Sequence, residues 1–123
     1  MQQVQAGTMA LVITSYEPKP EYKTNPLVTS AGQELKIVRM KDEEWQGWVL
    51  CENHEGTQGW VPENILKIVK DTGVVQEKYE ARELSAIEGE IVRIEKLESG
   101  WAWVTNMTND SGWVPMKNLK LVD

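Results

Sequence analysis

Apolar and polar residues alternate along several short segments of the chain. Residues 91–97 (IVRIEKL) alternate from Val92 onward, and residues 101–106 form a further apolar segment after Ser99 and Gly100. A period of two is typical of a strand that buries one face. Polar turn residues separate these segments, and no window between them has the i, i+3, i+4, i+7 spacing of an amphipathic helix. The pattern predicts an all-β fold.

The pattern occurs twice because the chain contains an internal repeat. Gly-Trp-Val-Pro stands at residues 59–62 and again at residues 112–115, an offset of 53. Upstream the offset grows to 57 and then to 63, where Tyr16 and Glu17 match Tyr79 and Glu80. Matched ends with unequal lengths between them are expected where loops vary and strands are kept.

The repeat predicts two consecutive barrels. We expect a disordered segment at residues 1–8, a barrel at residues 9–69 (repeat 1), a linker at residues 70–73 and a barrel at residues 74–123 (repeat 2). Each repeat has room for five short strands and one 3-10 turn after Val-Pro, which suits a small five-stranded barrel. A four-residue linker spans at most roughly 14 Å, so we expect a fixed or narrowly hinged pair.

The ordered motifs of each repeat resemble a known family. Tyr-Glu after an apolar strand, an acidic loop, Gly-Trp, and Gly-Trp-Val-Pro before a helical turn occur in this order twice. This layout resembles SH3 (Src-homology-3) domains, in particular the variant SH3 domains of bacteria, and it covers nearly everything except residues 1–8. The resemblance implies a non-enzymatic adaptor or regulatory protein that binds segments of other proteins.

Strand alternation indicates which side chains form the binding surface. Val104 and Cys51 suit a barrel interior, which leaves Trp101 and Trp48 on the outer face. Each repeat would then expose two Trp, one Tyr and one Pro, a surface suited to an extended, polyproline-II-like peptide. The alternative is that these Trp cover the barrel rim or lie between the two repeats. Together with the resemblance, the alternation predicts the following peptide-binding residues: Tyr16, Trp48, Trp60, Pro62, Ile65, Tyr79, Trp101, Trp113 and Pro115.

The chain departs from the SH3 pattern at one proline pocket. SH3 grooves usually carry a second Tyr where this chain has Thr14 and Glu77, and another where it has Ile65 and Asn118. The departure is larger in repeat 2, so the resemblance alone does not imply binding of ordinary Pro-x-x-Pro peptides.

The resemblance also implies an acidic loop that pairs with an Arg or Lys of the ligand. Its candidate residues are Glu17, Glu21, Glu80 and Glu83. Scattered surface glutamates are the alternative interpretation of the same residues.

Composition narrows the possible functions. The net charge of −6 on 123 residues argues against nucleic acid as a partner. One Cys and one His, Cys51 and His54, cannot supply a second ligand pair for a metal, and no phosphate-binding glycine loop occurs. We therefore expect no catalytic residues, no metal and no cofactor. Six Trp without a single Phe favour recognition over plain core filling.

The N-terminal region predicts a cytoplasmic chain. It has no basic segment, and the apolar run from Met9 to Ile13 is too short for a signal-peptide core or a membrane span. We expect a monomer that does not bind membranes. Two alternatives stay open: a self-associating protein whose Trp faces are buried in an oligomer, and a cell-wall-binding module if a leader was removed.

Overall fold

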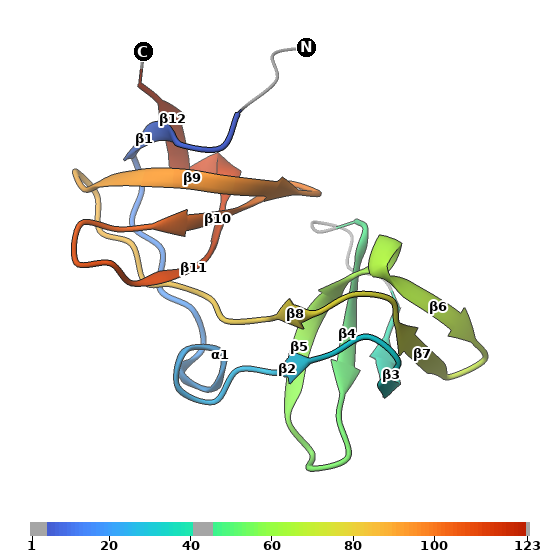
Figure 1. Ribbon diagram of the computed structural model, residues 1–123. Helices are drawn as coiled ribbons and strands as arrows, with labels where there is room; N and C mark the ends of the chain where they lie inside the picture. Colours follow the sequence, from blue (N-terminus) through green and yellow to red (C-terminus); the bar gives the residue numbers. More distant parts are fainter. Residues whose placement is uncertain (1–4, 41–45, 123) are drawn as a thin grey trace. The chain divides into compact units, whose positions relative to one another are not determined.

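The computed structural model describes residues 5–40 and 46–122, and Figure 1 shows its elements. The elements are β1 (Thr8–Val12), α1 (Pro20–Thr24), β2 (Val28–Thr29), β3 (Glu34–Arg39), β4 (Trp48–Glu52), β5 (Gln58–Pro62), the 3-10 turn η1 (Glu63–Ile65), β6 (Leu66–Val69), β7 (Thr72–Val75), β8 (Tyr79–Glu80), β9 (Ile91–Glu98), β10 (Trp101–Thr105), β11 (Ser111–Pro115), the 3-10 turn η2 (Met116–Asn118) and β12 (Leu119–Leu121). The predicted all-β class and the 3-10 turn after each Val-Pro are confirmed. No helix in this described part of the chain is long and apolar enough to cross a bilayer.

The chain forms two compact units. Unit 1 consists of residues 1–19 and 83–123, and unit 2 consists of residues 20–82. Unit 1 holds an antiparallel five-stranded sheet in the order β11-β10-β9-β1-β12, and unit 2 holds one in the order β5-β4-β3-β7-β6. The short strands β2 and β8 pair within unit 2.

The first strand of each repeat lies in the unit built from the other repeat. In Figure 1, β1 (blue) lies beside β9 and β12, with which it pairs, and β7 pairs with β3 and β6. The compact units therefore differ from the predicted boundaries at residues 9–69 and 74–123. An internal repeat shows which segments are equivalent, but it does not show which of two equivalent strands occupies a given position in a sheet.

The predicted linker at residues 70–73 is corrected by the same exchange. Val69 pairs with Thr72, so Lys70 and Asp71 form the turn of the β6–β7 hairpin. Lys70 adopts a φ of 57°, as a tight turn requires. The expectation of a fixed pair joined by a short tether loses its basis, because the chain passes between the units near residues 19–20 and 82–83 instead.

Equivalent backbone hydrogen bonds hold the exchanged strands in the two units. The Ile13 N–H donates to the Asn118 carbonyl in unit 1, and the Gln76 N–H donates to the Ile65 carbonyl in unit 2, both at 2.8 Å. These donors are 63 positions apart and these acceptors 53 positions apart, as in the sequence repeat. Each unit thus has an equivalent position, a slot between two strands, in which the first strand of a repeat pairs on both sides.

The described end of the predicted disordered segment is held in place. The Gly7 N–H donates to the Ile94 carbonyl at 2.7 Å, and the Thr8 N–H donates to the Gln5 carbonyl at 3.1 Å. The prediction is wrong for residues 5–8, because the Gly7 bond extends the pairing of β1 with β9 and the Thr8 bond closes a local turn before it. Residues 1–4 lie outside the described residues.

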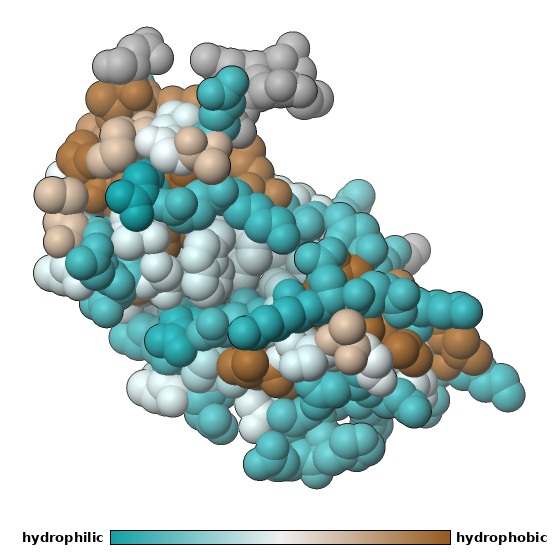
Figure 2. Space-filling view, viewed as in Figure 1, coloured by the Kyte–Doolittle hydropathy of each residue, from teal (hydrophilic) through white to brown (hydrophobic). Residues whose placement is uncertain are grey.

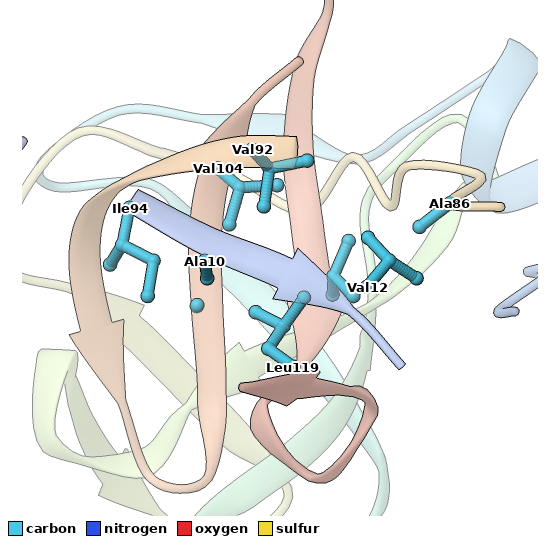
Figure 3. Close-up of a cluster of buried hydrophobic side chains, with 9 residues drawn as sticks. Ala10, Val12, Ala86, Val92, Ile94, Val104 and Leu119 are labelled. Atoms are coloured by element: carbon cyan, nitrogen blue, oxygen red, sulfur yellow. The ribbon is translucent and has the colours of Figure 1, made fainter. Parts of the chain in front are cut away.

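The inward faces follow the predicted alternation. In unit 1 the core gathers Ala10 and Val12 from β1 with side chains of β9, β10 and β11 (Figure 3). In unit 2, Val49, Cys51 and Val61 are fully buried. Burial of these aliphatic side chains is the main stabilising term for barrels of this size.

Candidate functional site

The predicted aromatic surface is mostly buried. Trp48, Trp101 and Trp113 are 4 %, 9 % and 4 % exposed. The remaining buried members of the predicted site are Pro62, Ile65, Tyr79 and Pro115. Tyr16 and Trp60 are half-buried. The expectation that each repeat exposes two Trp, one Tyr and one Pro is wrong, because alternation separates the two faces of a strand but does not show what packs over the outer face.

Tyr16 joins the aromatic side chains of repeat 2. Its ring meets the Trp101 ring edge-on, with centroids 5.6 Å apart and planes at 83°. Tyr16 and Ala86 exchange backbone hydrogen bonds of 2.8 and 2.9 Å. Tyr16 therefore forms a site with Trp101 and not with Trp48, and this site combines residues of both repeats.

A buried acid lies beside Tyr16. Glu83 is 8 % exposed, and its carboxylate accepts a hydrogen bond from the Tyr16 hydroxyl. Burial raises the pKa of Glu83 above its ordinary value, while the Tyr16 hydrogen bond and the positive charge of Lys19 oppose that shift. The backbone beside it follows β11, where the Leu84 N–H donates to the Trp113 carbonyl at 3.1 Å. We call Tyr16, Trp101 and Glu83 the unit 1 site.

The missing proline pocket of unit 1 is filled by polar contacts within the protein. Asn118 is 5 % exposed, and its Nδ2 donates to the carbonyls of Thr14 at 2.9 Å and Ser15 at 3.3 Å. Its Oδ1 is buried and has no hydrogen-bond partner among residues 5–40 and 46–122. Thr14 and Asn118, two of the four departures noted in the sequence, thus lie together.

The equivalent position in unit 2 has different chemistry. The Tyr79 hydroxyl donates to the Trp60 carbonyl at 2.8 Å, and Tyr79 is 8 % exposed. Pro26 stands 57 positions before Glu83, so unit 2 has no acid at the matching position. Unit 2 therefore has a buried Tyr hydroxyl bonded to a backbone carbonyl where unit 1 has the Tyr16–Glu83 pair.

The four candidate acids of the loop have different surroundings. Glu17 and Glu21 are exposed, and Glu80 pairs with Arg82 at 2.7 Å. Only Glu83 of these four is buried. Sequence reasoning placed Glu83 in the acidic loop but missed its bond to Tyr16, because that bond depends on the exchanged strand.

Trp113 was predicted as a peptide-binding residue, but its aromatic partner Trp103 was not. Trp103 and Trp113 lie opposite each other on β10 and β11, and their rings meet edge-on at 5.5 Å. The sequence carried a signal for this pair, since both residues lie on outward positions of adjacent strands.

The single Cys and the single His of the chain lie in different surroundings. Cys51 is fully buried, and burial raises the pKa of its thiol to about 12. His54 is exposed in the turn after β4. Within residues 5–40 and 46–122, no group of three His, Cys, Asp or Glu side chains is placed to hold a metal ion. The predicted inward position of Cys51 is confirmed.

The fold and site define a class of protein. Small five-stranded antiparallel sheets with a 3-10 turn before the last strand are SH3-like. Residues 9–69 match the sequence model of the family described as Variant SH3 domain. No curated protein matches the chain. Residues 9–19 of the matched segment belong to unit 1 and the rest to unit 2. SH3 domains as a class are non-catalytic modules for protein interaction.

Proposed function

We propose that the chain is a non-enzymatic adaptor with two SH3-like repeats, and that unit 1 binds an extended peptide carrying an apolar or proline residue next to an Arg or Lys. The observation that carries this proposal is the half-exposed Tyr16 ring, which packs on Trp101 and bonds to the buried Glu83.

The apolar part of the ligand packs on the aromatic rings. A half-exposed Tyr ring held edge-on against Trp101 is a rigid surface, and a proline in polyproline-II conformation loses little entropy on binding it. Rigid aromatic anchors of this kind contribute most of the binding energy in many interfaces.

The basic residue of the ligand pairs with Glu83. A carboxylate surrounded by apolar groups is poorly hydrated, and a cation that bonds to it stabilises the charged form. The net charge of −6 favours the approach of a basic peptide. Unit 2, with Pro26 in the matching position, lacks this second contact.

The self-associating alternative has less support. Trp48, Trp101 and Trp113 are already buried within a single chain. An oligomer is therefore not needed to remove these rings from water.

A titration of the full chain tests the proposal. The probe is a proline-rich peptide with one Arg, compared with the same peptide carrying Ala in its place, by calorimetry. Glu83→Gln should weaken binding of the Arg peptide about tenfold, because one charge-assisted bond is lost, and should leave the Ala peptide unaffected. Tyr79→Phe, which removes the equivalent hydroxyl in unit 2, is the matched control and should leave both affinities unchanged. Equal loss for both peptides, or no binding of either one, would contradict the proposal.

A further inference from the structure

Strand β1 is a central strand of unit 1 that is attached to the chain through a long connection. It pairs with β9 on one side and with β12 on the other. From Ile13 to Leu27 the chain has no strand, only the short α1 and the isolated bridge at Tyr16. Removal of β1 would therefore open a slot with unpaired backbone groups on both sides, and that slot must be filled.

The contacts that hold β1 between β9 and β12 involve residues that are present in every copy of the chain. Ala10 and Val12 fill the core, and the Val12 N–H donates to the Glu90 carbonyl at 2.8 Å. Unit 2 holds β7 in the same way, with the Val75 N–H donating to the Gln33 carbonyl at 2.9 Å. Each unit is thus completed by a strand that comes from outside its own repeat.

We propose that two copies of this chain form a closed dimer in which β1 of each copy fills the slot between β9 and β12 of the other. Residues 13–16 move with β1, because their backbone groups bond to Ala86 and Asn118 of the same unit. The dimer then makes the same contacts within each unit as the single chain does. Reciprocal exchange of an identical element gives a closed two-fold assembly and needs no new interface.

Concentration decides between the two forms. The strand of the same chain has an effective concentration of about 1 mM across a flexible connection, so the monomer dominates well below that value. Pro18, Pro20 and Pro26 stiffen the connection. The stiffness of the connection changes this effective concentration, and with it the protein concentration at which the two forms are equally populated.

An engineered disulfide reports which chain supplies the strand. Met9 and Arg93 are directly opposite on β1 and β9, and both side chains reach the solvent. In Figure 2 apolar surface (brown) lies over the part of unit 1 where Figure 1 shows β1 and β12, which agrees with exposures of 37 % for Met9 and 44 % for Val122. Opposite residues of an antiparallel pair are within disulfide reach.

The experiment uses the full chain with Met9→Cys and Arg93→Cys in a Cys51→Val background. The protein is unfolded, refolded at about 1 µM or at about 1 mM, and oxidised with glutathione disulfide, which is reduced as the two thiols couple. On a non-reducing gel we expect intrachain disulfide at the low concentration. At the high concentration about half of the protein should run as a covalent dimer.

A matched pair tests specificity. Lys36 is the repeat 1 equivalent of Arg93, 57 positions earlier, and it pairs with Thr72 on β7. Met9→Cys with Lys36→Cys should therefore give neither intrachain nor interchain disulfide. Interchain product from this control, intrachain product alone from the first pair at both concentrations, or no disulfide from the first pair would each overturn the proposal.

Discussion

Tyr16 and Tyr79 occupy the same position in two SH3-like units, yet their hydroxyls bond to different partners. Tyr16 donates to the carboxylate of Glu83, whereas Tyr79 donates to the backbone carbonyl of Trp60. The repeats also differ in sequence at this point, because unit 2 has Pro26 where unit 1 has Glu83. The same scaffold therefore places an acid beside the Tyr hydroxyl in unit 1 and a backbone carbonyl beside it in unit 2.

The backbone near these tyrosines differs for a similar reason. In unit 2 the Ala81 N–H donates to the Leu27 carbonyl at 2.8 Å and extends the β2–β8 ribbon. Pro18 is the unit 1 equivalent of Ala81 and has no N–H to donate. Unit 1 consequently has only an isolated bridge at Tyr16, and its site is less constrained than the equivalent region of unit 2. The two units therefore differ in backbone pairing at the position of the shared tyrosine.

The largest expected effect concerns a glycine that both units share. A Cβ added at Gly112 would lie 3.0 Å from the Leu84 backbone nitrogen and 3.1 Å from the Glu83 backbone carbon. A Cβ added at Gly59 would lie 2.9 Å from the Cβ atoms of Ala81 and Leu27. Gly112→Ala should cost about 3 kcal/mol, because the backbone must move, and Gly59→Ala about 2 kcal/mol.

Urea unfolding of both variants measures these costs. If Gly112→Ala were neutral, the close approach of the Glu83 segment to β11 would be wrong. In that case the geometry of the unit 1 site would need revision.

The fold could be predicted from the sequence to the level of its strands. Alternation identified the inward residues correctly, since Ala102 and Val104 are fully buried. The exchange of β1 and β7 could not be predicted, because Ala10 and Val12 of repeat 1 and Gly73 and Val75 of repeat 2 satisfy the same apolar pattern. The apolar alternation shows which face of a strand is buried, but the neighbouring strand with which it pairs depends on tertiary contacts.

The candidate site was predicted less completely. Tyr16, Trp101 and Glu83 were all singled out, but Tyr16 was grouped with Trp48. The burial of Trp48 was also missed, because a single sequence does not show which segments cover an outer face. The repeat alignment contains the difference between Glu83 and Pro26. Its structural role depends on Tyr16, which the exchange of β1 brings to Glu83.

The exchanged strands themselves give the next prediction. Ala10 is fully buried in unit 1, and its equivalent in unit 2 is Gly73. Ala10→Gly should cost about 1.5 kcal/mol through a lost methyl contact and greater freedom of the unfolded chain. Gly73→Ala should stabilise by about 0.5 kcal/mol, since the new Cβ would meet Leu66 and Ile37 at 3.4–3.8 Å, ordinary contact distances. Thermal unfolding checks both signs. Destabilisation by Gly73→Ala would show that the two slots are not equivalent.

The pH dependence of stability should distinguish the units as well. Burial raises the folded-state pKa of Glu83, so folding takes up a proton between its ordinary and its raised pKa. Glu83 then contributes stability at acid pH that is lost as pH rises through the raised pKa. Glu83→Gln should flatten this decline above about pH 4.3, the ordinary glutamate value. Unfolding free energies of the two proteins across that range provide the measurement, and parallel curves would contradict the burial of the charge.

The smallest expected effect concerns a core position at which unit 2 has Cys and unit 1 has Val. Cys51 in unit 2 is equivalent to Val104 in unit 1, and both are fully buried. Cys51→Val gives unit 2 the residue of unit 1 and should change stability by less than about 1 kcal/mol, because the volume is nearly conserved. In the unsubstituted chain a thiol with a pKa of about 12 carries little thiolate at pH 8. Its labelling by a thiol reagent should therefore be at least about 10³-fold slower in the native protein than in denaturant.

Labelling rates measured against urea concentration would report the opening of unit 2 alone, since unit 1 has no Cys. Fast labelling of the native protein would show that β4 presents its other face to the core, and the outward placement of Trp48 would fail with it.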